Sequence, residues 1–219
     1  PDLEVARAPW VASEPMIAEM RLQFWRDVAD EIGQGKPPRA HEVAEPLASV
    51  VRAEDAVHLD ALVAARRWDV YRDAFEDQAH FDRYIDATSG NLAWVGARVL
   101  GAEDAAEQAV RDIAWGAGVA SFLRAVPDLE ARGRVPLLDG RPQGVKALAE
   151  RALAGFLRGK AAQPGITASA RPALYAAWLT APVLRAAIAN PENVAVGNLG
   201  VSEFSKRARL LKASVTGRL

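Results

Sequence analysis

The residues best suited to chemistry in this chain are three closely spaced arginines, with two acids between them: Arg124, Asp128, Glu130, Arg132 and Arg134. A guanidinium group binds the oxygens of a phosphate or diphosphate through paired hydrogen bonds, so this cluster suits an anionic ligand. The same arginines can instead pair with Asp128 or Glu130, because charged side chains usually lie paired or solvated at the surface. The sequence leaves both interpretations open.

A second group of charges gives an alternative metal site. Asp69, Asp73 and Asp77 recur every four residues, a spacing that places carboxylates on one helix face, where they can hold a divalent ion. Phe75 and the many neighbouring charges favour a solvated acidic connection instead. Asp69 and Asp73 therefore stay as the alternative metal ligands, behind the interpretation that no metal is held.

The composition narrows the class of protein. The chain has 219 residues, a net charge of −1 and no cysteine, and its three histidines lack the spacing of a zinc site. The small net charge gives no reason to expect a nucleic-acid partner. The lack of cysteine excludes disulfides and a cysteine nucleophile, and it fits a cytoplasmic protein. We expect no stretch to be apolar over the roughly 18 residues that a membrane span needs.

Helical periodicity runs through nearly the whole chain, with Pro and Gly between the periodic segments, which predicts an all-α fold. In the first helix, Ser13 is the expected N-cap, and Ile17, Met20, Phe24, Val28 and Ile32 are expected to face the core. Pro127 is expected to end the helix that carries Arg124. Helices are predicted at about 15–32, 41–51, 55–67, 78–100, 104–125, 144–157, 168–189 and 200–215.

Small residues mark where a pocket is expected. Gly116, Ala117 and Gly118 lie on the helix at 104–125, and the helix at 78–100 also carries small side chains. Such residues either let helices pack closely or leave a cavity between them, and the sequence does not decide which. Ser121 and Ala125 are four residues apart and share a helix face with Ala117.

The stretch 124–135 resembles the second aspartate-rich motif of squalene and phytoene synthases, R-D-V-x-E-D-x-x-R-G-R-[IV]. Residues 20–25 are similar to the M-R-x-Q-[FW]-W helix of that family, and Tyr84 with residues 88–90 matches a third segment. The resemblance implies an all-α, single-domain helical bundle of the isoprenoid synthase type over residues 1–219. It also implies that the family's first helix is missing ahead of Pro1.

The family's metal-binding aspartates are replaced in this chain. Ala125 and Leu129 stand at the two aspartate positions of the motif, Asp128 stands where the family has Glu, and no aspartate pair precedes Met20. The resemblance therefore implies no confident catalytic residue and no cofactor, with Mg²⁺ needed only if prenyl transfer is retained. It implies Tyr84, Ser121, Arg124, Arg132 and Arg134 as candidate ligands of a diphosphate.

The chain is also similar to the branch of the family that includes a mitochondrial assembly factor for respiratory complex I, through residues 4–6, 20–25 and 123–127. This implies a non-catalytic scaffold for a protein client, with a bound isoprenoid or lipid. The alternative is a head-to-head prenyl transferase that condenses two prenyl diphosphates. The basic run 206–212 either complements the end of its helix or contacts an anionic membrane peripherally.

Overall fold

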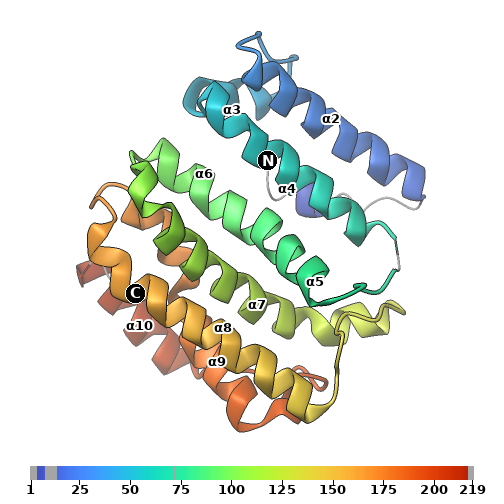
Figure 1. Cartoon of the computed structure of the whole chain (residues 1–219), viewed down its shortest axis with the longest axis vertical. Coiled ribbons are helices and arrows are strands. Elements are labelled where there is room, and N and C mark those ends of the chain that lie inside the picture. The colour runs from blue at the N-terminus through green and yellow to red at the C-terminus, as the bar shows by residue number, and fades with distance from the viewer. Residues whose placement is uncertain (1–3, 8–13, 72, 217–219) are drawn as a thin grey trace. The chain divides into compact units, whose positions relative to one another are not determined.

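The computed structural model describes residues 4–7, 14–71 and 73–216, without the side chains of 212–214 and 216. All regular structure in these ranges is helical, so the predicted all-α fold is confirmed (Figure 1). The main helices are α2 (Pro15–Gly33), α3 (Ala44–Val50), α4 (Ala56–Ala65), α5 (Gln78–Ile85), α6 (Asn91–Val99), α7 (Glu107–Ala131), α8 (Pro142–Ala162), α9 (Thr180–Ala189) and α10 (Glu203–Thr216). Among the elements that join them are the 3-10 helices η1 (Ala53–Asp55), η2 (Arg66–Asp69) and η6 (Arg171–Leu179) and the π-helical η3 (Asp86–Gly90).

The chain divides into two compact units, Pro1–Asp73 and Ala74–Leu219. In the first unit α2 packs against α4, and Leu22, Val28 and Leu62 are buried in its core. In the second unit α7 runs between the α5–α6 segment and α8, as Figure 1 shows. Burial of its apolar residues against these neighbours is the main force that holds α7 in place.

The predicted helix at 78–100 is confirmed, with one irregular turn. Asp77 caps it, because its Oδ1 accepts a hydrogen bond of 2.6 Å from the backbone N–H of His80. The π-helical turn η3 then separates α5 from α6. There the hydroxyl of Thr88 donates a hydrogen bond of 2.7 Å to the carbonyl of Tyr84, so a side chain helps to satisfy the widened backbone.

Pro127 does not end its helix, so that expectation is wrong. It lies inside α7, which continues to Ala131. A proline in a helix removes one backbone hydrogen bond, at a cost of about 3 kcal/mol. Val126 and Leu129 on either side are 1% and 7% exposed, so their burial offsets that cost.

The expected core face of the first helix is only partly right. Val28 and Ile32 are buried, but Ile17 is 39% and Met20 67% exposed, and Phe24 is half-buried. The buried face instead runs through Ala18, Leu22, Trp25, Val28, Ala29 and Ile32. The expected N-cap Ser13 lies outside the described residues, and α2 begins after Glu14, whose side chain makes no capping hydrogen bond.

One described segment, Arg171–Ala189, is long and apolar enough to cross a membrane by length and composition, with a mean hydropathy of 1.2. The expectation that no stretch reaches this threshold is therefore wrong. A core helix passes the same test, and this segment packs against α7 and α8. We treat it as part of the helical bundle.

Candidate functional site

The motif residues divide between an exposed and a buried side of α7. Ser121, Arg124 and Asp128 are exposed and Ala125 is half-buried, and their spacing places all four on one helix face. This face carries a hydroxyl, a guanidinium, a methyl and a single carboxylate. It suits an anionic group through Arg124, but it has one oxygen ligand where a metal cluster needs several.

Leu129, by contrast, is buried, with 7% of its surface exposed. Leu129 lies four positions after Ala125 on the same helix, and Val126 beside it in the sequence is also buried, at 1% exposed. The second aspartate position of the motif is therefore occupied by a core residue. A carboxylate there would be buried among apolar side chains, which is costly.

The retained Arg132-Gly133-Arg134 segment forms the C-terminal cap of α7. The N–H of Arg134 donates to the carbonyl of Leu129 at 3.1 Å, and the N–H of Gly133 donates to that of Glu130 at 2.8 Å. Gly133 has a φ of 75°. These two bonds and the left-handed glycine make a Schellman motif, which gives this part of the sequence a structural role.

The cap also separates the two later arginines. Arg132 is exposed, whereas Arg134 is 6% exposed and its side chain is engaged within the protein. Arg124 and Arg132 are thus exposed at the surface, whereas Arg134 is buried.

Tyr84 belongs to an aromatic cluster. Its ring centroid lies 5.4 Å from that of Phe75 and 6.2 Å from that of Phe122, and Phe81 packs on the same rings. The residue is 6% exposed. Edge-to-face contacts of this kind stabilise a core, so the structure places Tyr84 in packing between α5 and α7.

The small residues of α7 bring helices together. A Cβ added to Gly118 would lie 2.5 Å from Ser89 Oγ, and one added to Gly116 would lie 2.7 Å from the Cβ of Phe156. Both distances are below van der Waals contact, so each glycine permits a close helix–helix approach. At these two positions the geometry favours tight packing over a cavity.

A charged network around Arg111, which was not predicted from the sequence, joins α7 to η3 and the start of α6. Arg111 donates from Nε to Glu107 at 2.7 Å, and its Nη1 donates to Asp86 and Asn91 at 3.1 Å. Burial, the largest influence, opposes its charge, but the Glu107 hydrogen bond and the Asp86 carboxylate raise the pKa of Arg111 above its ordinary value. The spacing of Glu107 and Arg111 by four residues was the available signal.

The alternative metal residues lie in the first unit. Asp69 is 6% exposed and Arg66 Nη1 donates to its Oδ2 at 3.2 Å, whereas Asp73 is exposed. A carboxylate that already neutralises an arginine is a poor metal ligand. Within the part of the chain that the structure describes, no group of three or more His, Asp or Glu side chains is arranged to hold a metal.

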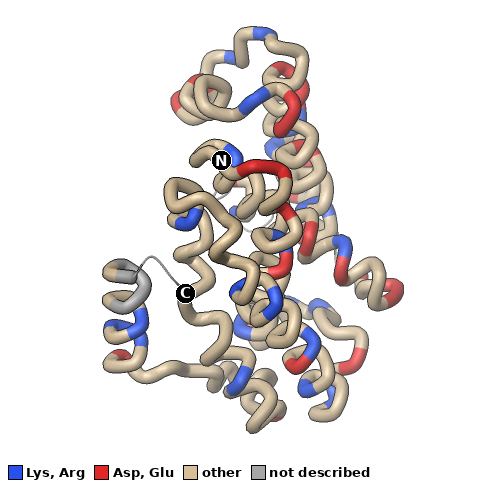
Figure 2. Tube along the Cα trace, turned by 60° about the vertical axis from the view of Figure 1, so that its left-hand side comes forward, with Lys and Arg blue, Asp and Glu red and all other residues tan. Residues whose placement is uncertain are grey.

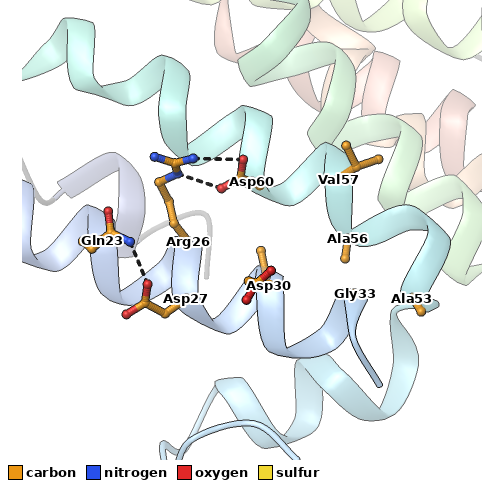
Figure 3. Close-up of a pocket in the computed structure, with 10 residues that line it drawn as sticks. Gln23, Arg26, Asp27, Asp30, Gly33, Ala53, Ala56, Val57 and Asp60 are labelled. Atoms are coloured by element: carbon orange, nitrogen blue, oxygen red, sulfur yellow. Dashed lines mark hydrogen bonds and ion pairs between the residues drawn. The ribbon is translucent and has the colours of Figure 1, made fainter. Parts of the chain in front are cut away.

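A polar groove of about 530 Å³ runs between α2 and α4 (Figure 3). Its carboxylates are already engaged. Arg26 donates to Asp60 at 2.7 and 3.2 Å, and Asp27 accepts from Gln23 at 2.6 Å and from Arg39 at 2.9 Å. These internal pairs leave the groove with little capacity for a cation.

A larger groove of about 750 Å³ in the first unit is lined by both apolar and charged side chains. The apolar lining comes from α2 and includes Ile17, Met20 and Phe24, the residues that were expected in the core. Its polar lining consists of Glu4, Arg7, Arg21 and His41. The ring of His41 lies 5.1 Å from that of Phe24, centroid to centroid, and is tilted by 53° to it.

This second groove has the chemistry of a site for an amphiphile, with cations for an anionic head and an apolar surface for a chain. Sequence reasoning assigned its residues to the core because it considered one stripe on α2. The signal was a second row, Ala18, Leu22, Trp25 and Ala29, at the same helical spacing. A helix with two adjacent apolar rows can bury one row and expose the other.

Comparison with known proteins identifies the family of this chain. The family model described as squalene/phytoene synthase matches residues 3–137. NADH dehydrogenase (ubiquinone) complex I, assembly factor 6, of Bos taurus is 28% identical over 137 residues, which cover 61% of this chain and 41% of that protein. The Drosophila melanogaster homolog is 30% identical over 132 residues, covering 57% of this chain and 39% of that protein. The chain thus spans about two fifths of the length of these relatives.

The fold has a solved counterpart. The crystal structure of a dehydrosqualene synthase in complex with ligand superposes with a TM-score of 0.74 over 98% of this chain and 84% of that chain, at 16% identity. At this identity the likeness establishes the fold alone. Because the family model covers more than half of the sequence, from residue 3 to residue 137, the chain belongs to the squalene/phytoene synthase family.

Proposed function

We propose that this protein is a non-catalytic member of its family that acts as an assembly factor or scaffold for a respiratory-complex client and binds an isoprenoid or lipid. The observation that carries the proposal is the exposed face of α7. It has Ala125 in place of one motif aspartate, and the other position is filled by Leu129, which packs in the core.

Prenyl transfer needs a diphosphate leaving group whose charge is neutralised. Metal ions held by carboxylates supply several kcal/mol of such stabilisation, and each 1.36 kcal/mol lost slows a reaction about tenfold. Ala125 and Leu129 have no oxygen ligand, and Asp128 alone does not build a cluster. The residues present therefore do not fit the Mg²⁺ ions of the family's chemistry.

The groove lined by Met20 and Phe24 is the site that we assign to the amphiphile. Its volume of about 750 Å³ is in the range of small-molecule pockets. Arg7 and Arg21 are among its lining residues, so an anionic head and an apolar chain can both be accommodated without a metal.

The client is proposed from the relatives that bear the name of complex I assembly factor 6, which match over 132 to 137 residues. The lack of cysteine supports a cytoplasmic location. Arg124 and Asp128 on one exposed face leave a prenyl transferase as the second candidate. It would need metal ligands such as Asp69 and Asp73, and Asp69 is already paired with Arg66.

The test is turnover of farnesyl or geranylgeranyl diphosphate with and without Mg²⁺, followed by product analysis. We expect no product above the protein-free control. In parallel, affinity capture of the tagged protein from its own cells is expected to recover respiratory-complex subunits. Mg²⁺-dependent condensation at an enzyme-like rate would overturn the non-catalytic assignment and favour the transferase.

Thermal unfolding locates the ligand. A prenyl diphosphate that binds the folded state raises the melting temperature by mass action, and here it is expected to do so without Mg²⁺. Met20→Glu should abolish this rise, because Met20 lines the groove. Met16→Glu is the matched control, since both methionines are 67% exposed on the same helix and Met16 is outside the lining. Equal loss in both variants would contradict the assignment of the groove.

A further inference from the structure

Helix α10 carries an exposed apolar stripe. Phe204, Ala208, Leu211 and Val215 follow one another at intervals of four, three and four residues, which places them on one helix face. Phe204 is 83%, Leu211 65% and Val215 77% exposed, and Ala208 is exposed as well. Large apolar side chains in a contiguous exposed row mark an interaction surface.

Basic residues border this stripe. Arg207 and Arg209 are exposed and alternate with the apolar positions, and Lys206 is half-buried with its Nζ 2.5 Å from Glu203 Oε1. Figure 2 shows these basic residues along the helix that precedes the undescribed C-terminal residues, at the margin of the second unit. With one acid against three bases in its described side chains, the helix favours an anionic partner.

A different part of α10 attaches it to the fold. The helix contacts η6, and its half-buried residues are Ser205 and Lys206, which lie away from the exposed row. The contacted η6 belongs to the apolar segment Arg171–Ala189, in which 33% of the most apolar 18-residue window is buried. The packing therefore leaves the apolar stripe directed outward while the helix stays joined to the second unit.

We infer that α10 lies on the surface of an anionic lipid bilayer, with Phe204, Leu211 and Val215 inserted among the acyl chains and Arg207 and Arg209 at the headgroup phosphates. An amphipathic helix with this arrangement lies in the plane of the interface, and its binding combines apolar burial with attraction to anionic lipids. The inference stands on α10 alone, so it holds or fails separately from the proposed client and groove.

Vesicle co-sedimentation of the full chain tests this. Phosphatidylcholine vesicles are compared with vesicles that also contain phosphatidylglycerol, and we expect binding to depend on the anionic lipid. Phe204→Ser and Leu211→Ser should each lower the partition coefficient by about tenfold, because each loses apolar burial. Arg207→Gln should lower it by about fivefold and only for the anionic vesicles.

Leu157→Ser is the matched control for Leu211→Ser. Leu157 is a 43% exposed leucine on α8, outside the stripe. Circular dichroism should show the helix content of the native protein in every variant. Wild-type protein that stays in the supernatant with both vesicle types would overturn the inference and assign the stripe to a protein partner. Equal loss of binding in Leu157→Ser would overturn it too.

Discussion

At the scale of single residues, position 129 carries the main difference from a metal-binding site. Leu129 is 7% exposed, so Leu129→Asp removes apolar contacts and places a carboxylate in the core. We expect the free energy of unfolding to fall by about 3 to 5 kcal/mol. Urea unfolding followed by circular dichroism measures it.

Ala125→Asp is the internal comparison, because Ala125 is half-buried on the exposed side of the same helix. It should change the free energy of unfolding by about 1 kcal/mol or less. A mild effect of Leu129→Asp, equal to that of Ala125→Asp, would mean that position 129 is open, and the argument against a metal cluster would lose its basis.

Gly133 tests the structural role of the retained motif. Its φ of 75° is strained for any residue with a Cβ, so Gly133→Ala should lower the free energy of unfolding by about 1 kcal/mol. Gly140→Ala is the control, since nothing lies within 4 Å of a Cβ added there. If both variants unfold at the same urea concentration, the cap does not need its glycine.

At the scale of elements, Gly118 tests the close approach of α7 to η3. In Gly118→Ala the new Cβ would meet Ser89 and Ile85 at 2.5 to 2.8 Å, so the free energy of unfolding should fall by about 1 to 3 kcal/mol. Gly155→Ala should be neutral or stabilising by up to about 1 kcal/mol, because its nearest neighbour would lie 3.5 Å away. A stabilising Gly118→Ala would instead indicate a cavity at this contact.

Helical periodicity in the sequence predicted the helices. Tertiary packing determined where some of them end and which of their faces is buried. The helix from Gln78 was predicted from the helical periodicity of the chain, and the structure adds the cap at Asp77. The prediction that Pro127 ends its helix was wrong, because burial of Val126 and Leu129 outweighs one lost backbone hydrogen bond. On α2 two adjacent apolar rows compete, and only the fold shows which one is buried.

The sequence predicted which residue types make up the candidate site, but it predicted only in part where their side chains lie. The arginine-rich motif was found by its residues, but the sequence does not show that Arg134 is buried while Arg124 and Arg132 are exposed. That division follows from the Schellman cap, in which the chain reverses at Gly133. Likewise the pairing of Asp69 with Arg66 depends on the η2 turn, which replaces a regular helix at this point.

At the scale of the whole molecule, the chain divides after Asp73 into two compact units. The prediction of a single domain over residues 1–219 raises the question of whether these units fold independently. The apolar groove and the polar groove lie in the first unit, and the motif helix and α10 lie in the second. Each proposed activity can therefore be assigned to a unit. Groove binding belongs to Pro1–Asp73, and bilayer binding belongs to Ala74–Leu219.

The fragment Ala74–Leu219 is expected to fold without the first unit. Its core cluster, from Trp94 to Ala177, and its aromatic cluster around Phe122 lie within this range. We therefore expect a helical spectrum and a single cooperative urea transition. A fragment that starts at Asn91 is the control, because it lacks Phe75, Phe81 and Tyr84 and should unfold without cooperativity. If Ala74–Leu219 is unfolded while the full chain shows one transition, the first unit is required for folding and the chain behaves as one domain.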